Sequence, residues 1–146
     1  MNILIGEDDN DIVLMYSELL KDRGHGVAVA NDGQKCLAIY NENLGDPSDP
    51  TTTTKQQNQP FDVVVLDYKM PKLDGFEVAR KIISSNPHQR IILASAYSKE
   101  IFDDAAEYFN LPIEIIQKPF SGSKFIELIE NRVLLSRSLV QDKSVN

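Results

Sequence analysis

Short apolar runs alternate along this chain with longer segments whose apolar residues recur at helical spacing. The runs have the length of strands and the segments that of helices, a pattern typical of strand–helix–strand units around a parallel sheet. We predict strands at residues 2–6, 26–30, 61–66, 90–94 and 113–117, followed by helices at 9–23, 33–43, 74–85, 98–109 and 121 to about 139. The predicted fold class is α/β, a doubly wound five-stranded parallel sheet with strand order 2-1-3-4-5 between two layers of helices.

Helical periodicity assigns many apolar residues to the core rather than to a ligand site. Gly24 suits the left-handed residue that ends a helix. Cys36, the single cysteine, lies beside Leu37 in a helical pattern and is predicted to be a packing residue. The predicted buried face of the first helix consists of Ile12, Met15, Leu19 and Leu20.

The length of 146 residues fits one domain, which we assign to residues 1–140, with a polar tail at 141–146. Residues 45–60 contain three prolines and four consecutive threonines, and they have too few apolar side chains to order themselves. We therefore predict a flexible insertion there. A tether for a partner, or a modification site within residues 51–54, is the functional alternative for this insertion.

Composition and charge exclude several classes of function. A net charge of −7 argues against nucleic acid as the main partner. No apolar stretch approaches the length of a membrane span, and Met1 leads straight into a strand, so we expect a cytoplasmic protein.

Neither His25 nor His88 has a second ligand at metal-binding spacing, and both are predicted to be structural or solvent-facing.

Polar side chains follow four of the predicted strands at the points where these strands end. Glu7 and Asp8 follow the first strand, Asp67 the third, Ser95 the fourth and Lys118 the fifth. The carboxyl ends of parallel strands share one edge, and ligands bind outside that edge where the strand order reverses. With the order 2-1-3-4-5, the reversal lies between the first and third strands, so the three carboxylates are expected to share one pocket.

Three neighbouring carboxylates repel one another unless a cation compensates them. Oxygen ligands without histidine or cysteine favour a hard ion such as Mg²⁺, and Lys118 adds a positive charge. Asp67 is then a candidate nucleophile that accepts a phosphoryl group, and Ser95 a hydrogen-bond donor to it. The ordinary alternatives are a turn aspartate, a strand-end serine, a surface lysine and a helix-capping acidic pair.

The segments around these residues resemble the receiver domain of two-component response regulators, which has a flavodoxin-like, CheY-like three-layer fold. The resemblance covers nearly the whole chain. It rests on residues 3–9 (ILIGEDD), 66–75 (LDYKMPKLDG), 93–96 (LASA) and 117–120 (QKPF).

The resemblance implies that Asp67 accepts a phosphoryl group from a histidine kinase or a histidine phosphotransfer protein. It implies Mg²⁺ (or Mn²⁺) held by Asp8, Asp67 and the main-chain carbonyl of Lys69, with Glu7 acting through water. The remaining roles that it implies are a switch hydroxyl at Ser95, a phosphate-contacting lysine at Lys118 and a cis peptide bond before Pro119.

The sequence departs from the family at the output side. Ile115 stands three positions before Lys118, where the family usually has an aromatic ring that moves with the hydroxyl of the switch. The output face implied by the resemblance combines the fourth helix, the fifth strand and the last helix. Tyr97 and Lys69 are large enough to obstruct water at an aspartyl phosphate, so we expect a long-lived phosphoryl group.

No output domain is expected after the last helix, so the output would be a partner protein. The apolar residues at the end of that helix fit either a surface for dimerisation or docking, including a homodimer formed on phosphorylation, or simple packing on the sheet. They are Leu134, Leu135, Leu139 and Val140.

The preferred function is a stand-alone phosphorylation switch, not an enzyme acting on an external substrate. One alternative is a docking domain that works without phosphorylation, which Ile115 keeps open. A less favoured one is an aspartate-nucleophile Mg²⁺ phosphatase, but position 69 offers no second acid and the short chain leaves little room for a cap.

Overall fold

The computed structural model describes residues 1–45, 48–51, 59–96 and 113–130. Within these ranges the chain forms one parallel sheet with the strand order β2-β1-β3-β4-β5. Its strands are β1 (Asn2–Gly6), β2 (Gly26–Ala30), β3 (Val63–Asp67), β4 (Ile91–Ser95) and β5 (Ile113–Gln117). This topology confirms the predicted fold class.

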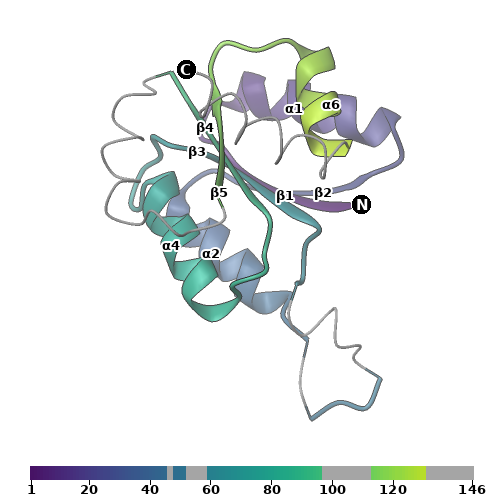
Figure 1. Cartoon of the computed structure of the whole chain (residues 1–146), viewed down its shortest axis with the longest axis vertical. Helices are drawn as coiled ribbons and strands as arrows, with labels where there is room; N and C mark the ends of the chain where they lie inside the picture. Colours follow the sequence, from purple (N-terminus) through teal and green to yellow (C-terminus); the bar gives the residue numbers. More distant parts are fainter. Residues whose placement is uncertain (46–47, 52–58, 97–112, 131–146) are drawn as a thin grey trace, which may run out of the picture.

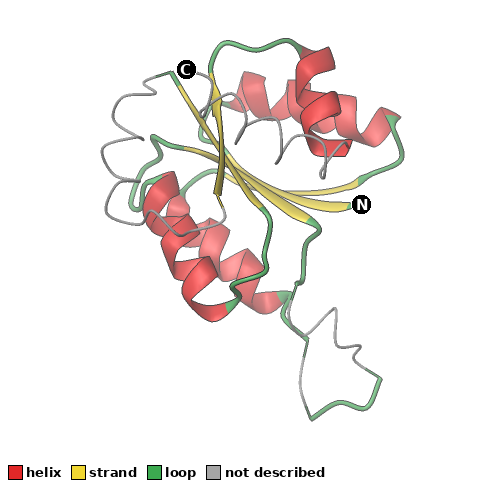
Figure 2. Cartoon of the chain, viewed as in Figure 1, coloured by secondary structure: helices red, strands yellow, loops and turns green. Residues whose placement is uncertain are grey.

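Helices cover both faces of the sheet. Helices α1 (Asn10–Asp22) and α6 (Gly122–Glu130) lie on one face, and α2 (Gly33–Glu42) and α4 (Gly75–Ser85) lie on the other (Figure 1). Figure 2 shows the strands as a single layer between these two groups. No described helix is long and apolar enough to cross a membrane.

Several predictions fall wholly or partly outside the described residues. They concern the helix at 98–109, the extension of the last helix past Glu130 with its apolar residues, the polar tail at 141–146 and most of the insertion at 45–60.

An aspartate fixes the start of three of these helices. Asp9, Asp32 and Asp74 each stand immediately before a helix, and each side chain accepts hydrogen bonds from main-chain amides of the first turn. These amides have no partner within the helix, so the capping carboxylates stabilise the helix starts. The caps place the beginnings of α1, α2 and α4 at the carboxyl edge of the sheet, close to the strand ends that precede them.

The core consists of two apolar layers, one on each side of the central strands. Leu4, Val64 and Leu93 pack against α2 and α4. Ile3, Val65 and Ile92 pack against α1 and α6. Because side chains alternate along a strand, β1, β3 and β4 are apolar on both faces, as buried parallel strands require.

Two smaller predictions are confirmed. Cys36 is fully buried, and burial raises the pKa of its thiol to about 12, as expected of an inert packing residue. Gly24 follows the C-cap of α1 with φ of +85°, the left-handed conformation expected there.

One residue of the predicted buried face of α1 was assigned incorrectly, whereas Leu20 is buried as predicted. Met15 was expected in the core, but it is 44% exposed, and Tyr16 is buried instead. A helix turns by about 100° per residue, so Ile12, Tyr16 and Leu20 form one stripe towards the sheet and Met15 lies beside it. The ring of Tyr16 stacks on those of Phe120 and Phe125, with centroid distances of 5.9 and 4.3 Å, which holds α1 against α6.

Strands β3 and β4 both reach one residue further than predicted. They include Asp67 and Ser95, because the Tyr68 amide donates to the Ala94 carbonyl at 2.9 Å and the Lys118 amide to the Ser95 carbonyl at 2.8 Å. At its other end β3 begins at Val63, two residues later than predicted, and the Asp62 carboxylate accepts a hydrogen bond from the Asn2 amide. Asp67 and Ser95 are therefore the last residues of hydrogen-bonded strands, so the sheet fixes their main chain.

Candidate functional site

The carboxyl edge of the sheet brings the predicted site residues to neighbouring positions. Glu7 follows β1 and Asp67 ends β3, where Gly6 pairs with Leu66. Ser95 is buried at the end of β4, one residue beyond the partner of Asp67. Lys118 follows β5, and its amide donates to the Ser95 carbonyl at 2.8 Å.

Lys118 connects two of the three carboxylates. Its Nζ lies 2.9 Å from Oε1 of Glu7 and 3.0 Å from Oδ1 of Asp67. One carboxylate oxygen from each of Glu7, Asp8 and Asp67 lies within 4.8 Å of the others. The second oxygen of Glu7 accepts the Asp8 amide at 3.0 Å, so the main chain after β1 orients this carboxylate.

Burial and mutual repulsion shape the titration of this cluster. Glu7 is 2% exposed, and burial, followed by the negative charge of Asp67, raises its pKa although Lys118 opposes the shift. The pKa of Asp8 is also raised, by partial desolvation and by its hydrogen bond with Glu7. Desolvation works to lower the pKa of Lys118, but its bonds to Glu7 and Asp67 outweigh this and raise it. Lys118 therefore remains an ammonium, while Glu7 and Asp8 bind protons more readily than usual.

The charges of Glu7, Asp8, Asp67 and Lys118 do not balance. When all groups are ionised, three carboxylates and one ammonium give −3 + 1 = −2. A divalent cation offsets this charge, and Mg²⁺ is usually bound in proteins by one or two carboxylates together with several waters that it retains. The donor set of the structure therefore fits a hard divalent ion.

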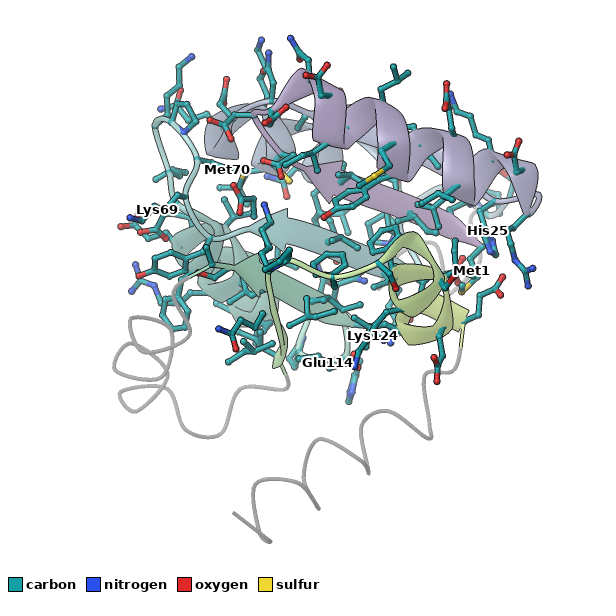
Figure 3. The ribbon with its side chains drawn as sticks, turned by 90° about the horizontal axis from the view of Figure 1, so that it is seen from above. Met1, His25, Lys69, Met70, Glu114 and Lys124 are labelled. Atoms are coloured by element: carbon teal, nitrogen blue, oxygen red, sulfur yellow. The ribbon has the colours of Figure 1, made fainter. Side chains whose placement is uncertain are left out.

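A tight connection leads from Asp67 into α4. The Gly75 amide donates to the Tyr68 carbonyl at 2.8 Å, which closes the loop 68–74 at its base. A Cβ atom at Gly75 would lie 2.3 Å from the Asp67 carbonyl oxygen, so only glycine allows this approach. Met70 is buried, whereas Lys69 is exposed; Figure 3 shows both at the end of the molecule opposite Met1 and His25.

The remaining predicted site residues have varied outcomes. The Lys118–Pro119 peptide bond is cis, as the resemblance implied. Ile115 is half-buried on β5, in register with Leu93. Tyr97 lies outside the described residues.

Sequence reasoning missed a buried ion pair at the opposite edge of the sheet. Arg90 precedes β4 and makes two 3.0 Å hydrogen bonds to the carboxylate of Glu114 on β5. The same guanidinium donates to the carbonyls of Leu128 and Ile129 near the end of α6, at 2.7 and 2.8 Å. No sequence motif indicates this ion pair, because Arg90 and Glu114 are distant in sequence and both are residue types that are common at protein surfaces.

A second cluster at that edge involves His25, which was predicted to be structural or solvent-facing. Its Nε2 lies 2.9 Å from the Glu130 carboxylate, which also accepts from Arg23. The His25 side chain is only 10% exposed, so its role is structural.

Comparison with known proteins gives the class that this fold and site define. The profile of the response regulator receiver domain family matches residues 3–130. The chain therefore belongs to the response regulator receiver domain family.

Individual proteins agree with this assignment. The chain is similar to the transcriptional regulatory protein RprY of Bacteroides fragilis, with 28% identity over 91% of this chain and 50% of the relative. It also resembles probable histidine kinase 2 of Oryza sativa subsp. indica, with 25% identity over 88% of this chain and 12% of the relative. The chain thus spans half or less of these two curated relatives.

Solved structures show the same fold. A response regulator receiver domain protein from Clostridium thermocellum superimposes with a TM-score of 0.71 and 26% identity, covering 94% of this chain and 98% of that one. A CheY-like receiver domain protein from Methanospirillum hungatei gives the same TM-score at 20% identity, covering 94% and 96% of the two chains.

Proposed function

We propose that this receiver domain is a phosphorylation switch in which Asp67 accepts a phosphoryl group from a histidine kinase or a histidine phosphotransfer protein. The observation that carries the proposal is the position of Asp67. Its carboxylate ends a central strand, contacts the Lys118 ammonium at 3.0 Å and lies beside Glu7 and Asp8. A carboxylate in this position is oriented as a nucleophile and has cationic support for incoming phosphoryl oxygens.

The transfer step exchanges one bond to phosphorus for another. A carboxylate oxygen of Asp67 forms the new O–P bond, while the P–N bond of the donor's phosphohistidine breaks and its electron pair stays on the imidazole nitrogen. We propose that Lys118 donates to a phosphoryl oxygen and that the Ser95 hydroxyl, at the end of the neighbouring strand β4, contacts another. Positioning and charge stabilisation supply most of the catalysis in such transfers.

We assign the divalent cation of this step as Mg²⁺, which Mn²⁺ can replace. The proposed ligands are Asp8, Asp67 and the main-chain carbonyl of Lys69, with Glu7 acting through water. When bound, the ion neutralises charge on the transferring phosphoryl group. Glu7 and Lys118 form an ion pair with each other, and this pair lies next to the carboxylate of Asp67.

The proposed output is binding to a partner protein in the cytoplasm. The face involved would include β5, with Ile115, together with α6 and the predicted helix at 98–109. The family usually has an aromatic residue at the position of Ile115. Movement of Ser95 towards the phosphoryl group would therefore change this face without the movement of an aromatic ring. The proposed binding partner is a downstream protein or a second copy of the phosphorylated chain, which would form a homodimer.

The function is tested by intact-protein mass after incubation with acetyl phosphate, with and without Mg²⁺, beside an Asp67→Asn control. We expect a single phosphoryl adduct that requires Mg²⁺ and is absent from the control. Histidine-kinase donors would be tried in the same assay. If no donor produced an adduct, the result would favour a docking domain independent of phosphorylation; many phosphate ester turnovers per protein would instead favour the phosphatase.

A further inference from the structure

The loop after Asp67 contains a backbone turn of an uncommon kind. The Leu73 amide donates to the Pro71 carbonyl at 2.9 Å, and Lys72 between them has φ of +72°. An i→i+2 hydrogen bond around a residue of positive φ forms a γ-turn of the rare, strained type. Lys72 is the one residue other than glycine with positive φ among those described.

The start of α2 contacts the same turn. The Gly33 amide donates to the Pro71 carbonyl at 3.2 Å, so this oxygen accepts hydrogen bonds from both Gly33 and Leu73. A Cβ atom at Gly33 would lie 2.2 Å from the Leu73 carbonyl oxygen and 2.6 Å from the Leu73 Cβ. Gly33 is a helical residue, so it is needed here for space and not for an unusual conformation.

Asp32 adds a charged contact to this backbone junction. One of its carboxylate oxygens caps α2 by accepting the Lys35 amide at 2.8 Å, and the other lies 3.6 Å from Nζ of Lys72. Asp32 is buried and therefore held in place, whereas Lys72 is half-exposed. The contact holds the residue of positive φ from the side of α2.

The loop is consequently fixed at two points. Its base is closed by the Tyr68–Gly75 hydrogen bond, and its tip is held by Asp32 and Gly33. Lys69, whose carbonyl is a proposed metal ligand, lies between these two points. Strained residues persist where the surroundings hold them, and they are common at functional sites.

We propose that Asp32 and Gly33 are positioning residues for the phosphoryl-transfer site: they hold the strained turn at Lys72, and so set the path of the loop 68–74 beside Asp67. This inference rests on the proposed function. It assigns to α2, which contributes no metal ligand, the task of placing the main-chain carbonyl of Lys69 for the divalent ion.

The first test uses Gly33→Ala, whose new Cβ atom must push the turn away. The matched control is Gly122→Ala, because Gly122 is also the first residue of a helix but its Cβ would meet only the flexible end of Leu19, at 2.9 Å. Mn²⁺ affinity is measured by the loss of the paramagnetic resonance signal of the free ion, and stability by urea unfolding in EDTA. We expect roughly tenfold weaker Mn²⁺ binding for Gly33→Ala and an unchanged affinity for the control.

The second test uses Lys72→Gly, which separates positioning from stability. Glycine adopts positive φ freely, so the strain is relieved, but the turn is loosened and the contact with Asp32 is lost. We expect a urea midpoint equal to or above that of the wild type, together with Mn²⁺ affinity that is roughly threefold or more weaker. A purely structural turn would leave the Mn²⁺ affinity of Lys72→Gly unchanged. This variant decides the matter if Gly33→Ala does not fold.

The outcomes distinguish the inference from the function on which it rests. If wild type binds Mn²⁺ and forms the phosphoryl adduct, but folded Gly33→Ala and Lys72→Gly bind the ion as tightly as wild type, the positioning role is wrong and the function stands. If wild type itself neither binds Mn²⁺ nor forms the adduct, the proposed function is wrong and the inference falls with it.

Discussion

The two edges of the sheet both collect charged side chains, and they do so in different ways. At the carboxyl edge, Lys118 contacts two of three neighbouring carboxylates, Glu7 and Asp67, and Asp8 lies beside them. At the amino edge, Arg90 is matched to Glu114 by two hydrogen bonds. Burial is similar at the centre of each cluster, since Glu7 is 2% exposed and the Arg90 side chain 4%.

The difference lies in what each cluster leaves unsatisfied. At the amino edge, the guanidinium also donates to two carbonyls of α6, so the pair satisfies itself within the fold. At the carboxyl edge a net negative charge remains, and the pKa values of Glu7 and Asp8 are raised. Buried charge alone therefore does not distinguish the edge proposed to be functional from the other edge, whereas uncompensated charge does.

The largest effect is expected from Arg90→Leu. The variant removes the two hydrogen bonds from Arg90 to Glu114 and takes this buried donor away from the carbonyls of Leu128 and Ile129, so the free energy of unfolding should fall by about 3–5 kcal/mol. Urea unfolding measures it. The matched control is Arg23→Leu at the same edge, whose side chain is 55% exposed, so the loss of its solvent-screened ion pair should have a much smaller effect.

Equal losses for Arg90→Leu and Arg23→Leu would contradict the account of the amino edge as a buried, self-satisfied pair. A double variant, Arg90→Met with Glu114→Leu, sharpens the test. It removes both charges, so it should recover much of the stability lost in Arg90→Leu.

An effect of the opposite sign is expected from Asp8→Asn. In EDTA, the loss of one repelling carboxylate should raise the free energy of unfolding by about 1 kcal/mol. In excess Mg²⁺ the order should reverse, because wild type is stabilised by the bound ion and the variant much less. Thermal unfolding in both buffers measures the crossing.

Asp11→Asn is the matched control, since it removes the same charge three residues further along the chain, from the exposed first turn of α1. It should show no Mg²⁺-dependent reversal. Wild type and Asp8→Asn keeping the same order in EDTA and in Mg²⁺ would show that the carboxyl edge holds no cation through Asp8.

The smallest effects are expected in the pH dependence of stability in EDTA. Arg23, and then His25, lower the pKa of Glu130 to about 2 from 4.5, so its contribution is present above pH 4.5 and is lost as the pH falls towards 2. Glu7 and Asp8 have raised pKa values, so they favour the folded state at low pH and this advantage is lost as the pH rises. The two edges therefore respond to acid in opposite directions.

Urea unfolding from pH 2 to pH 6 separates these contributions. Relative to wild type, Glu130→Gln should be less stable at pH 6 and Asp8→Asn more stable, and both differences should shrink as the pH falls. Differences of the same sign, or differences that do not vary with pH, would refute the contrast between the edges.

Much of the fold was predictable because hydrophobic periodicity is local. The bounds of β1, β2 and β5 agree with the prediction, and α1, α2 and α4 each lie within one residue of theirs. Met15 was assigned to the wrong face because it is apolar and neighbours the true stripe, in which a tyrosine takes the core position.

The site was approachable from the sequence for a different reason. In a parallel sheet the carboxyl ends of all strands lie at the same edge. The proximity of Glu7, Asp67 and Lys118 could therefore be predicted from the strand order alone. The turn at Lys72 and its contact with Gly33 were not predictable, because a residue of positive φ other than glycine leaves no signal in the sequence. The Arg90–Glu114 pair was missed because it joins positions that no local pattern relates.

The most direct test of the central claim is to locate the phosphoryl group. After incubation with a phosphodonor and Mg²⁺, borohydride reduction would convert an aspartyl phosphate to homoserine, and tandem mass spectrometry of the peptides would identify its position. The account predicts homoserine at position 67 and an unmodified peptide containing Asp8. Homoserine at Asp8 or at any other acidic residue, with Asp67 intact, would contradict it.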